Sequence, residues 1–463
     1  MSVVETQGRR PPYLSAAAAG PPGRVRRSPF GWAVFLVLFS VIIPREAAGI
    51  DSQSPSWIYL KAFGDFRWID VMVFSVLGLV AALRIGSNRF FKLHAPKDMG
   101  RWSVLFGSAI VLSMVHGSLA GGTELFFDWQ GLAVGFAFML VLYQLVRTRP
   151  GAVRVAALAL IAVLVGRAVY QLANFFAGTS GVTLQGVRIP VFDGPTLSNT
   201  VFVLIAAGCI AVGWKRGPFS ARLLCGGAAM VALVLVVLAF RRTYWGEAFV
   251  GLVAILLVFN KRRLSALLTV VALAVALLPY LPGEFRLRAE SANPFAADEN
   301  RYTETNDDHL NDLRDAWDVI KQDPVLGYGL GRPYETERVQ NWKFTSWGVH
   351  NAVLHVWLRY GALGLISFLA LHLATLRWLL RLSRRFHPDS FERWWVIAGF
   401  SYITATLVVS LFASPWPYGA SQNSMLILGV VGTAFALQNQ LRSRAPIPRN
   451  VDVGPEGSAP RLA

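Results

Sequence analysis

The sequence is poor in charge and in cysteine. Charged residues make up only 15% of the 463 residues, whereas apolar residues make up 54%. The two cysteines, Cys209 and Cys225, fall in or beside long apolar runs, so we expect them to pack as small apolar side chains. No catalytic serine triad, Cys/His zinc spacing or dinucleotide-binding fingerprint occurs. The soluble enzyme classes that these motifs mark are therefore not favoured.

Apolar residues instead form long blocks, many of them near the length that crosses a hydrocarbon core of about 30 Å. We predict an all-α polytopic membrane protein with about twelve transmembrane helices. The predicted spans are residues 30–43, 68–83, 102–119, 126–146, 153–177, 199–214, 223–240, 244–259, 264–280, 350–376, 394–413 and 424–441. The first span resembles a cleavable signal, but the eleven spans after it favour an uncleaved helix.

The net charge of +17 follows the predicted topology. With the N-terminus inside, 28 basic residues fall on the inner side and 14 on the outer side, 8 of the latter in one long loop. Lys and Arg accumulate in short cytoplasmic loops, so both termini are predicted to be cytoplasmic. This distribution explains the charge without nucleic acid as a partner.

The predicted organisation has five parts. Residues 1–29 and 442–463 are expected to be disordered cytoplasmic ends, 30–280 to hold helices 1–9, 281–349 to form an outer loop module, and 350–441 to hold helices 10–12. Within the loop, an N-cap sequence at Asn306 precedes apolar residues at helical spacing, and Pro324 ends the pattern. Those apolar residues are Leu310, Leu313, Trp317 and Ile320.

Two arginines run against the charge bias. Arg241 and Arg242 occupy the short outer turn between the seventh and eighth spans, where topology requires no positive charge. Paired guanidinium groups suit a pyrophosphate, which needs several charge-assisted donors. The alternative is a pair that reaches to lipid headgroups.

A third arginine, Arg167, lies well inside the fifth span and forms a polar stripe with Tyr170, Gln171 and Asn174. A charge at that depth costs about 2.5–3.5 kcal/mol on insertion scales, so it should face a cavity or a partner. It is either a residue lining the path of a lipid-phosphate headgroup or a structural hydrogen-bond hub.

His350 stands where the long polar loop meets the tenth span. Its ordinary pKa suits a general base. The competing interpretation is an interfacial histidine that backbone groups satisfy. His355 and Arg359, further along the same span, are expected to make packing or secondary contacts. The acidic cluster of Asp307, Asp308, His309 and Asp312 is interpreted as a solvated helix start and not as a metal site.

Several motifs together resemble the O-antigen ligase and O-antigen polymerase superfamily of GT-C-type membrane glycosyltransferases. Residues 313–331 resemble its Arg/Trp helix followed by Pro-x-x-Gly-x-Gly, and His350-Asn351 with Gly361 and Gly364-Leu365 resembles its His-Asn start of the next span. Arg242 resembles its arginine before the loop. The resemblance is specific over residues 240–371; upstream it rests on span number and topology.

The resemblance implies an inverting transfer without metal or cofactor, on the periplasmic face of the bacterial inner membrane. The donor would be a glycan on undecaprenyl pyrophosphate. The acceptor would be lipid A–core, a second lipid-linked repeat unit, or a protein hydroxyl. By position, Arg242 and Arg314 would hold the pyrophosphate with Arg241 as a helper, and His350 would activate the acceptor hydroxyl. Arg314 lies three residues before Trp317, where four is expected, so Arg301 is an alternative.

Asn351 is a further candidate for lining the cavity. The competing function is a twelve-span transporter or a flippase for lipid-linked glycans. A major-facilitator protein would have its long loop inside and would show symmetry between its halves, and neither feature is present in the sequence.

Overall fold

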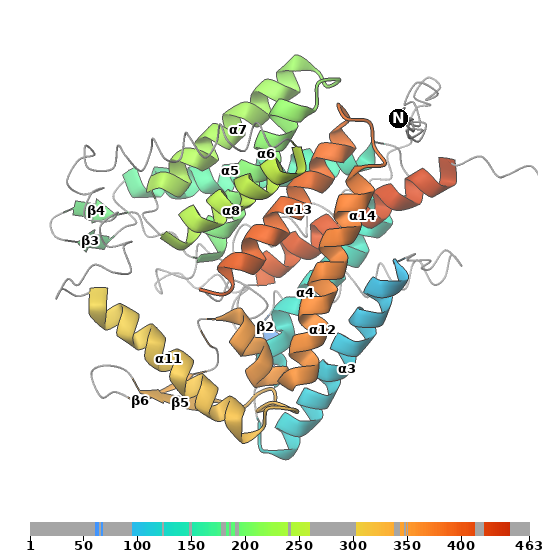
Figure 1. Cartoon of the computed structure of the whole chain (residues 1–463). Coiled ribbons are helices and arrows are strands. Elements are labelled where there is room, and N and C mark those ends of the chain that lie inside the picture. Colours follow the sequence, from blue (N-terminus) through green and yellow to red (C-terminus); the bar gives the residue numbers. More distant parts are fainter. Residues whose placement is uncertain are drawn as a thin grey trace, which may run out of the picture.

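The computed structural model of the chain describes residues 61–63, 66–67, 95–122, 125–147, 151–176, 182–184, 187–189, 194–238, 242–259, 302–337, 343–346, 349, 351–412 and 421–444. Ten helices and three two-stranded hairpins occur in these residues (Figure 1). The helices are α3 (Lys97–Leu119), α4 (Leu125–Val146), α5 (Ala152–Phe176), α6 (Gly194–Gly213), α7 (Phe219–Leu238), α8 (Arg242–Phe259), α11 (Tyr302–Gln322), α12 (Ala352–Ser383), α13 (Phe391–Val409) and α14 (Ser421–Arg444).

Nine of the predicted spans coincide with a described helix, within a few residues at most ends. The predicted spans 30–43, 68–83 and 264–280 lie outside the described residues, as do 1–29 and 445–463. The last helix continues to Arg444, so residues 442–444 are helical where we predicted a disordered tail. The helical fold class is confirmed for the described residues, and the number of twelve spans stays a prediction.

The described residues also form three short antiparallel hairpins, which the prediction of an all-α chain did not include. They are β1 (Lys61–Phe63) with β2 (Phe66–Arg67), β3 (Val182–Leu184) with β4 (Val187–Ile189), and β5 (Tyr334–Glu337) with β6 (Lys343–Ser346). Each pairs segments close together in the sequence, so the hairpins satisfy backbone groups locally without building a sheet.

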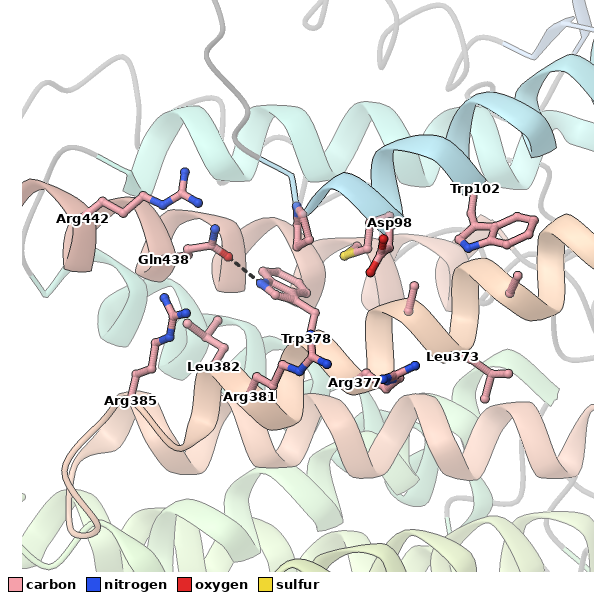
Figure 2. Close-up of a pocket in the computed structure, with 14 residues that line it drawn as sticks. Asp98, Trp102, Leu373, Arg377, Trp378, Arg381, Leu382, Arg385, Gln438 and Arg442 are labelled. Carbon is pink, nitrogen blue, oxygen red and sulfur yellow. Dashed lines mark hydrogen bonds between the residues drawn. The ribbon is translucent and has the colours of Figure 1, made fainter. Parts of the chain in front are cut away.

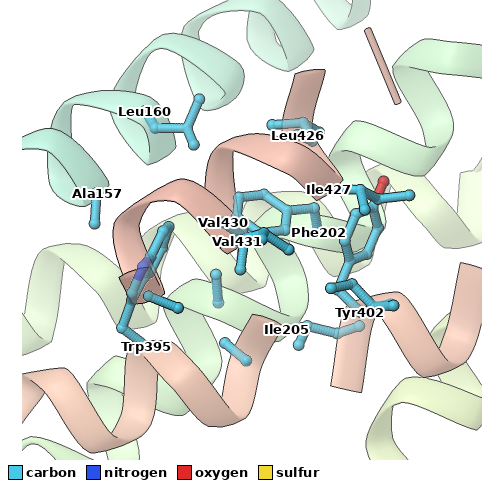
Figure 3. Packing of buried hydrophobic residues seen from close by; sticks show 14 of the residues in the cluster. Ala157, Leu160, Phe202, Ile205, Trp395, Tyr402, Leu426, Ile427, Val430 and Val431 are labelled. Carbon is cyan, nitrogen blue, oxygen red and sulfur yellow. The ribbon is translucent and has the colours of Figure 1, made fainter. Parts of the chain in front are cut away.

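The core of the molecule forms where α6 and α13 meet α5 and α14 (Figure 3). The buried ring of Phe202 lies edge-on to Trp395 and Tyr402, with ring centroids 5.9 and 5.0 Å away. The indole N–H of Trp395 donates to Thr433 Oγ1 at 2.8 Å. A buried indole needs such a partner, so this bond also joins α13 to α14.

Apolar side chains cover much of the outer surface as well. On α3 and α7, Val104, Leu119, Phe219 and Leu224 are each more than 60% exposed. Patches of this kind on a folded chain mark a surface that contacts lipid or another apolar partner. Five described helices are long and apolar enough to cross a membrane: Lys97–Leu119, Ala152–Tyr170, Phe219–Leu238, Ala352–Ser383 and Ser424–Ser443. The exposed apolar surface and these helices identify a multi-pass membrane protein.

The loop module contains α11 and the hairpin β5–β6, which lie together at one end of the molecule (Figure 1). Helix α11 begins at Tyr302, four residues before the predicted N-cap at Asn306, so Asn306 lies within the helix. Its buried residues also differ from the predicted set, because Leu310 is 50% exposed and Trp317 40% exposed, whereas Ala316 and Ile320 are buried. The hairpin accounts for this shift: Tyr334 donates its hydroxyl to Asp312 Oδ1 at 3.1 Å and turns the Asp312 face inward.

Candidate active site

The segment between α11 and the hairpin is a glycine loop, residues 323–331, that docks into a kink of α12. Gly327, Gly329 and Gly331 all have positive φ (78°, 90° and 73°), as does Gly361 within α12 (66°). A Cβ on Gly361 would lie 2.0 Å from the Val325 carbonyl oxygen. Only glycine allows this backbone conformation and this close approach. The Gly-x-Gly pattern therefore packs backbone against backbone.

The glycine loop forms hydrogen bonds with backbone groups of α12 that have no helical partner at the kink. The Ala362 N–H donates to the Pro324 carbonyl at 3.0 Å, and the Tyr328 N–H donates to the Leu358 carbonyl at 2.6 Å. Ser113 of α3 donates its hydroxyl to the Arg359 carbonyl at 2.6 Å. An interrupted helix at membrane depth needs such partners, because lipid supplies none.

Arg359 fixes the loop from inside. Its buried guanidinium donates through Nη1 to the carbonyl oxygens of Gly329 and Arg332. Arg332 in turn stacks over the Tyr328 ring, 3.9 Å from its centroid. These contacts agree with the structural role expected for Arg359.

The start of α12 is held against the end of α13. Asn351 is the N-cap: its Oδ1 accepts the Leu354 N–H at 2.9 Å, and its Nδ2 donates to the Leu411 carbonyl at 2.8 Å. The Ala352 N–H donates to the Ser410 carbonyl at 2.8 Å. His350 itself lies outside the described residues, but Asn351 after it is fixed by two side-chain hydrogen bonds and Val349 before it is fully buried.

Helix α8 begins at Arg242, two residues before the predicted start of the span at residue 244, so Arg242 belongs to the helix and not to the turn before it. The Arg242 side chain and all of Arg241 lie outside the described part of the chain. Five residues later, about 7.5 Å along the helix axis, Glu247 is fully buried. Its Oε1 accepts hydrogen bonds from Ser198 Oγ and Thr406 Oγ1, both at 3.0 Å.

Sequence reasoning missed Glu247. Its Oε2 has no hydrogen-bond partner among the described residues, and Ser198 Oγ shares a further hydrogen bond of 2.9 Å with Tyr402 Oη. An acidic side chain within an apolar span carries the same insertion cost that singled out Arg167. That cost was the signal that could have found it.

One turn of α13 connects the two candidate helix ends. The Thr406 hydroxyl donates to Glu247 of α8. The Thr406 carbonyl accepts two hydrogen bonds from Ser410, one from its backbone N–H (2.9 Å) and one from its hydroxyl (2.6 Å). The Ser410 carbonyl then accepts the Ala352 N–H of α12. The structure thus brings the N-terminal ends of α8 and α12 to the same side of the molecule through residues 406–410.

The other predicted site residues differ in their surroundings. Arg314 is exposed on α11 and makes one long hydrogen bond, 3.5 Å from Nη1 to Asn311 Oδ1. Arg301 lies outside the described residues. Arg167 is buried, only 4% exposed, while Tyr170 on the predicted stripe is 56% exposed. Arg167 is thus enclosed by protein, as expected for a charge at that depth, and the side chains of Gln171 and Asn174 lie outside the described part of the chain.

Among the residues that the structure describes, no group of three or more His, Cys, Asp or Glu side chains could hold a metal ion. Asp312 instead holds Tyr334, as described above. The side chains of Asp307, Asp308 and His309 lie outside the described part.

The family comparison covers the elements that make up this site. Residues 227–369 match the Wzy_C family model, which is described as O-antigen ligase. The matched range contains all of α8 and α11, the glycine loop and the kinked first part of α12. A comparison with curated proteins gives no match. Residues 227–369 of this multi-pass membrane protein are therefore similar to the O-antigen ligase family.

Proposed function

We propose that the protein transfers a glycan from undecaprenyl pyrophosphate to an acceptor hydroxyl on the periplasmic face of the inner membrane. The family match supports glycan transfer in surface polysaccharide assembly. The observation that carries the finer proposal is the turn 406–410, which ties the helix that Arg242 opens to the helix that His350 precedes. A pyrophosphate at the first helix end would then lie beside a base at the second.

The reaction is a single displacement at the anomeric carbon. His350 takes the proton of the acceptor hydroxyl, whose oxygen bonds to that carbon while the bond to the pyrophosphate oxygen breaks. Undecaprenyl pyrophosphate leaves with the bonding electrons, and attack from the opposite side inverts the configuration. Arg242, Arg241 and either Arg314 or Arg301 stabilise the developing negative charge.

The N-terminus of α8 supports this assignment on electrostatic grounds. The unpaired N–H groups and the helix dipole at an N-terminus favour an anion. Arg242 stands at that end of α8, so its charge and the dipole would act on the same phosphate. Asn351 would act indirectly, by holding the backbone next to His350.

The test is glycan profiling of cells whose native protein is replaced by His350→Ala, with membrane insertion confirmed. We expect loss of mature surface glycan and accumulation of lipid-linked material, because the acceptor hydroxyl lacks its base. Accumulated long chains would indicate a ligase, and single repeat units a polymerase. His387→Ala, on the turn between α12 and α13, is the matched control and should retain surface glycan.

An unchanged glycan profile in His350→Ala would overturn the base assignment. A flippase or transporter would give a different outcome again, because lipid-linked material would then accumulate on the inner leaflet. The two results are separated by labelling with a lectin that cannot cross the inner membrane, applied to cells with a permeabilised outer membrane and to lysed cells.

A further inference from the structure

A pocket of about 450 Å³ lies at the end of the helices opposite the candidate active site (Figure 2). It is lined by the start of α3, the second half of α12 and the end of α14. The glycine loop contacts the other ends of the same two helices, at Gly117 of α3 and Gly361 of α12. The pocket is therefore separate from the elements that the proposed function uses.

Four arginines line this pocket. Arg377 and Arg381 of α12 and Arg385 in the turn after it follow one another at intervals of four, and Arg442 comes from α14 (Figure 2). Asp98 is the one acidic residue of the lining. None of the four guanidinium groups has an ion pair or hydrogen bond with a residue that the structure describes. Like charges at i, i+4 spacing repel each other. The pocket therefore carries excess positive charge that an anion would neutralise.

The pocket is apolar on the side toward the middle of α12. Leu373 lies one turn before Arg377 and is 59% exposed, and Ile366 a further two turns back is 58% exposed. Trp378 stands at the level of the arginines and Trp102 at the level of Leu373 (Figure 2), and the Trp378 indole is fixed by a hydrogen bond to Gln438. Tryptophan and arginine at one level with exposed aliphatic residues beyond them are typical of a membrane–water interface.

We propose that this pocket binds an anionic phospholipid, with the headgroup phosphate on the arginines and the acyl chains along Leu373 and Ile366. Arginine is suited to phosphate because its planar fork gives two parallel hydrogen bonds. Basic pockets between helices on the cytoplasmic side are a recurring site for anionic lipid headgroups. A water-soluble phosphate shares the charge chemistry, but it would leave the exposed aliphatic flank without a partner.

The test uses the full chain, purified in detergent and stripped of lipid, with phosphatidylglycerol or phosphatidylcholine added in mixed micelles. Bound lipid is counted by native mass spectrometry. The pocket variant is Arg377→Gln/Arg381→Gln/Arg385→Gln. The control variant, Arg101→Gln/Lys215→Gln/Arg384→Gln, removes the same charge from exposed residues outside the pocket lining.

We expect the wild type and the control variant to prefer phosphatidylglycerol by about tenfold or more, and the pocket variant to lose that preference. Equal loss in both variants would overturn the proposal in favour of general surface charge. Protection against thermal unfolding by sodium phosphate alone, with no retained phosphatidylglycerol, would identify a soluble anion and overturn the lipid assignment. Should the pocket variant fail to fold, the single change Arg381→Gln gives the same comparison, with an expected loss of about threefold or more.

Discussion

At the residue scale, Glu247 and Arg314 are charged side chains in opposite surroundings. Glu247 is fully buried between three helices and accepts two hydroxyl hydrogen bonds. Arg314 is exposed and has one contact at the limit of hydrogen-bond distance. Replacing a buried group disturbs its partners, whereas replacing an exposed one leaves the fold intact and changes only what it binds.

Arg314→Gln should reduce glycan transfer by about tenfold to a hundredfold, the range expected when one hydrogen bond to a charged group is lost. The physical reason is that its guanidinium is exposed and has one weak partner among the described residues, so it remains available for an anionic donor. Transfer is measured on purified protein with a lipid-linked glycan donor. Arg301→Gln is the comparison: if it alone abolishes transfer, Arg301 is the loop arginine and Arg314 is not.

Glu247→Ala should lower the free energy of unfolding by about 1–3 kcal/mol, because two buried hydroxyls lose an acceptor and a cavity remains. Glu247→Gln should retain most of the stability, since its amide oxygen can still accept from Ser198 and Thr406. The measurement is thermal unfolding in detergent.

Glu392→Ala serves as the matched control for that experiment. It breaks an ion pair with Arg154, whose side chain is 44% exposed. Such a pair contributes about 0–1 kcal/mol. Equal unfolding midpoints for Glu247→Ala and Glu392→Ala would show that the buried carboxylate does not join the helices.

At the scale of elements, the glycine loop and the kink of α12 form one interlocked unit. The sequence predicted that Pro324 ends the helical pattern of the loop module. The structure agrees, because α11 ends at Gln322 and the glycine loop after it docks on helices. The kink at Gly361 was not predicted, because an isolated glycine within an apolar run does not reveal a positive φ.

Gly361→Ala should cost about 3 kcal/mol or more, since a side chain at φ 66° is strained and its Cβ would collide with the Val325 carbonyl. The unfolding midpoint in detergent and the yield of membrane-inserted protein both report the change. Gly166→Ala in α5 is the control, because no atom lies within 4 Å of its added Cβ. A helix interior favours Ala over Gly by about 1 kcal/mol, so this variant should be at least as stable as the wild type. Equal behaviour of the two variants would contradict the interlocked loop.

At the scale of the whole molecule, hydrophobic run length located the helices well. Nine predicted spans match described helices because about twenty apolar residues in a row have few alternatives to a membrane helix. The length of a hydrophobic run does not predict which helices pack against each other. Lipid-facing and protein-facing sides are both apolar, so the sequence could not show that α4 packs on α14 or that α12 packs on α3.

The candidate site shows the same contrast between local and long-range features. Local patterns predicted span boundaries close to Arg242, at the start of α8, and to Asn351, at the start of α12. The link through Thr406 and Ser410 depends on three helices that are distant in the sequence. No local pattern contains that information.

The predicted orientation is tested by cysteine labelling in intact cells with a permeabilised outer membrane. Asp318→Cys on α11 should react with an impermeant maleimide, and Lys215→Cys between α6 and α7 should react only after lysis. Both positions are exposed, and the native Cys209 and Cys225 are buried, so background labelling should be low. Labelling of Lys215→Cys in intact cells would reverse the assigned sides.

The contact between Ser113 and the Arg359 carbonyl joins residues 246 positions apart. A chain synthesised from its N-terminus inserts α3 long before the glycine loop and α12 exist. The docking surface of α3 must therefore wait until α12 has been synthesised. Truncated products that stop before α12 would leave this surface open to chaperones and membrane proteases, so quality control can distinguish them from chains that contain α12.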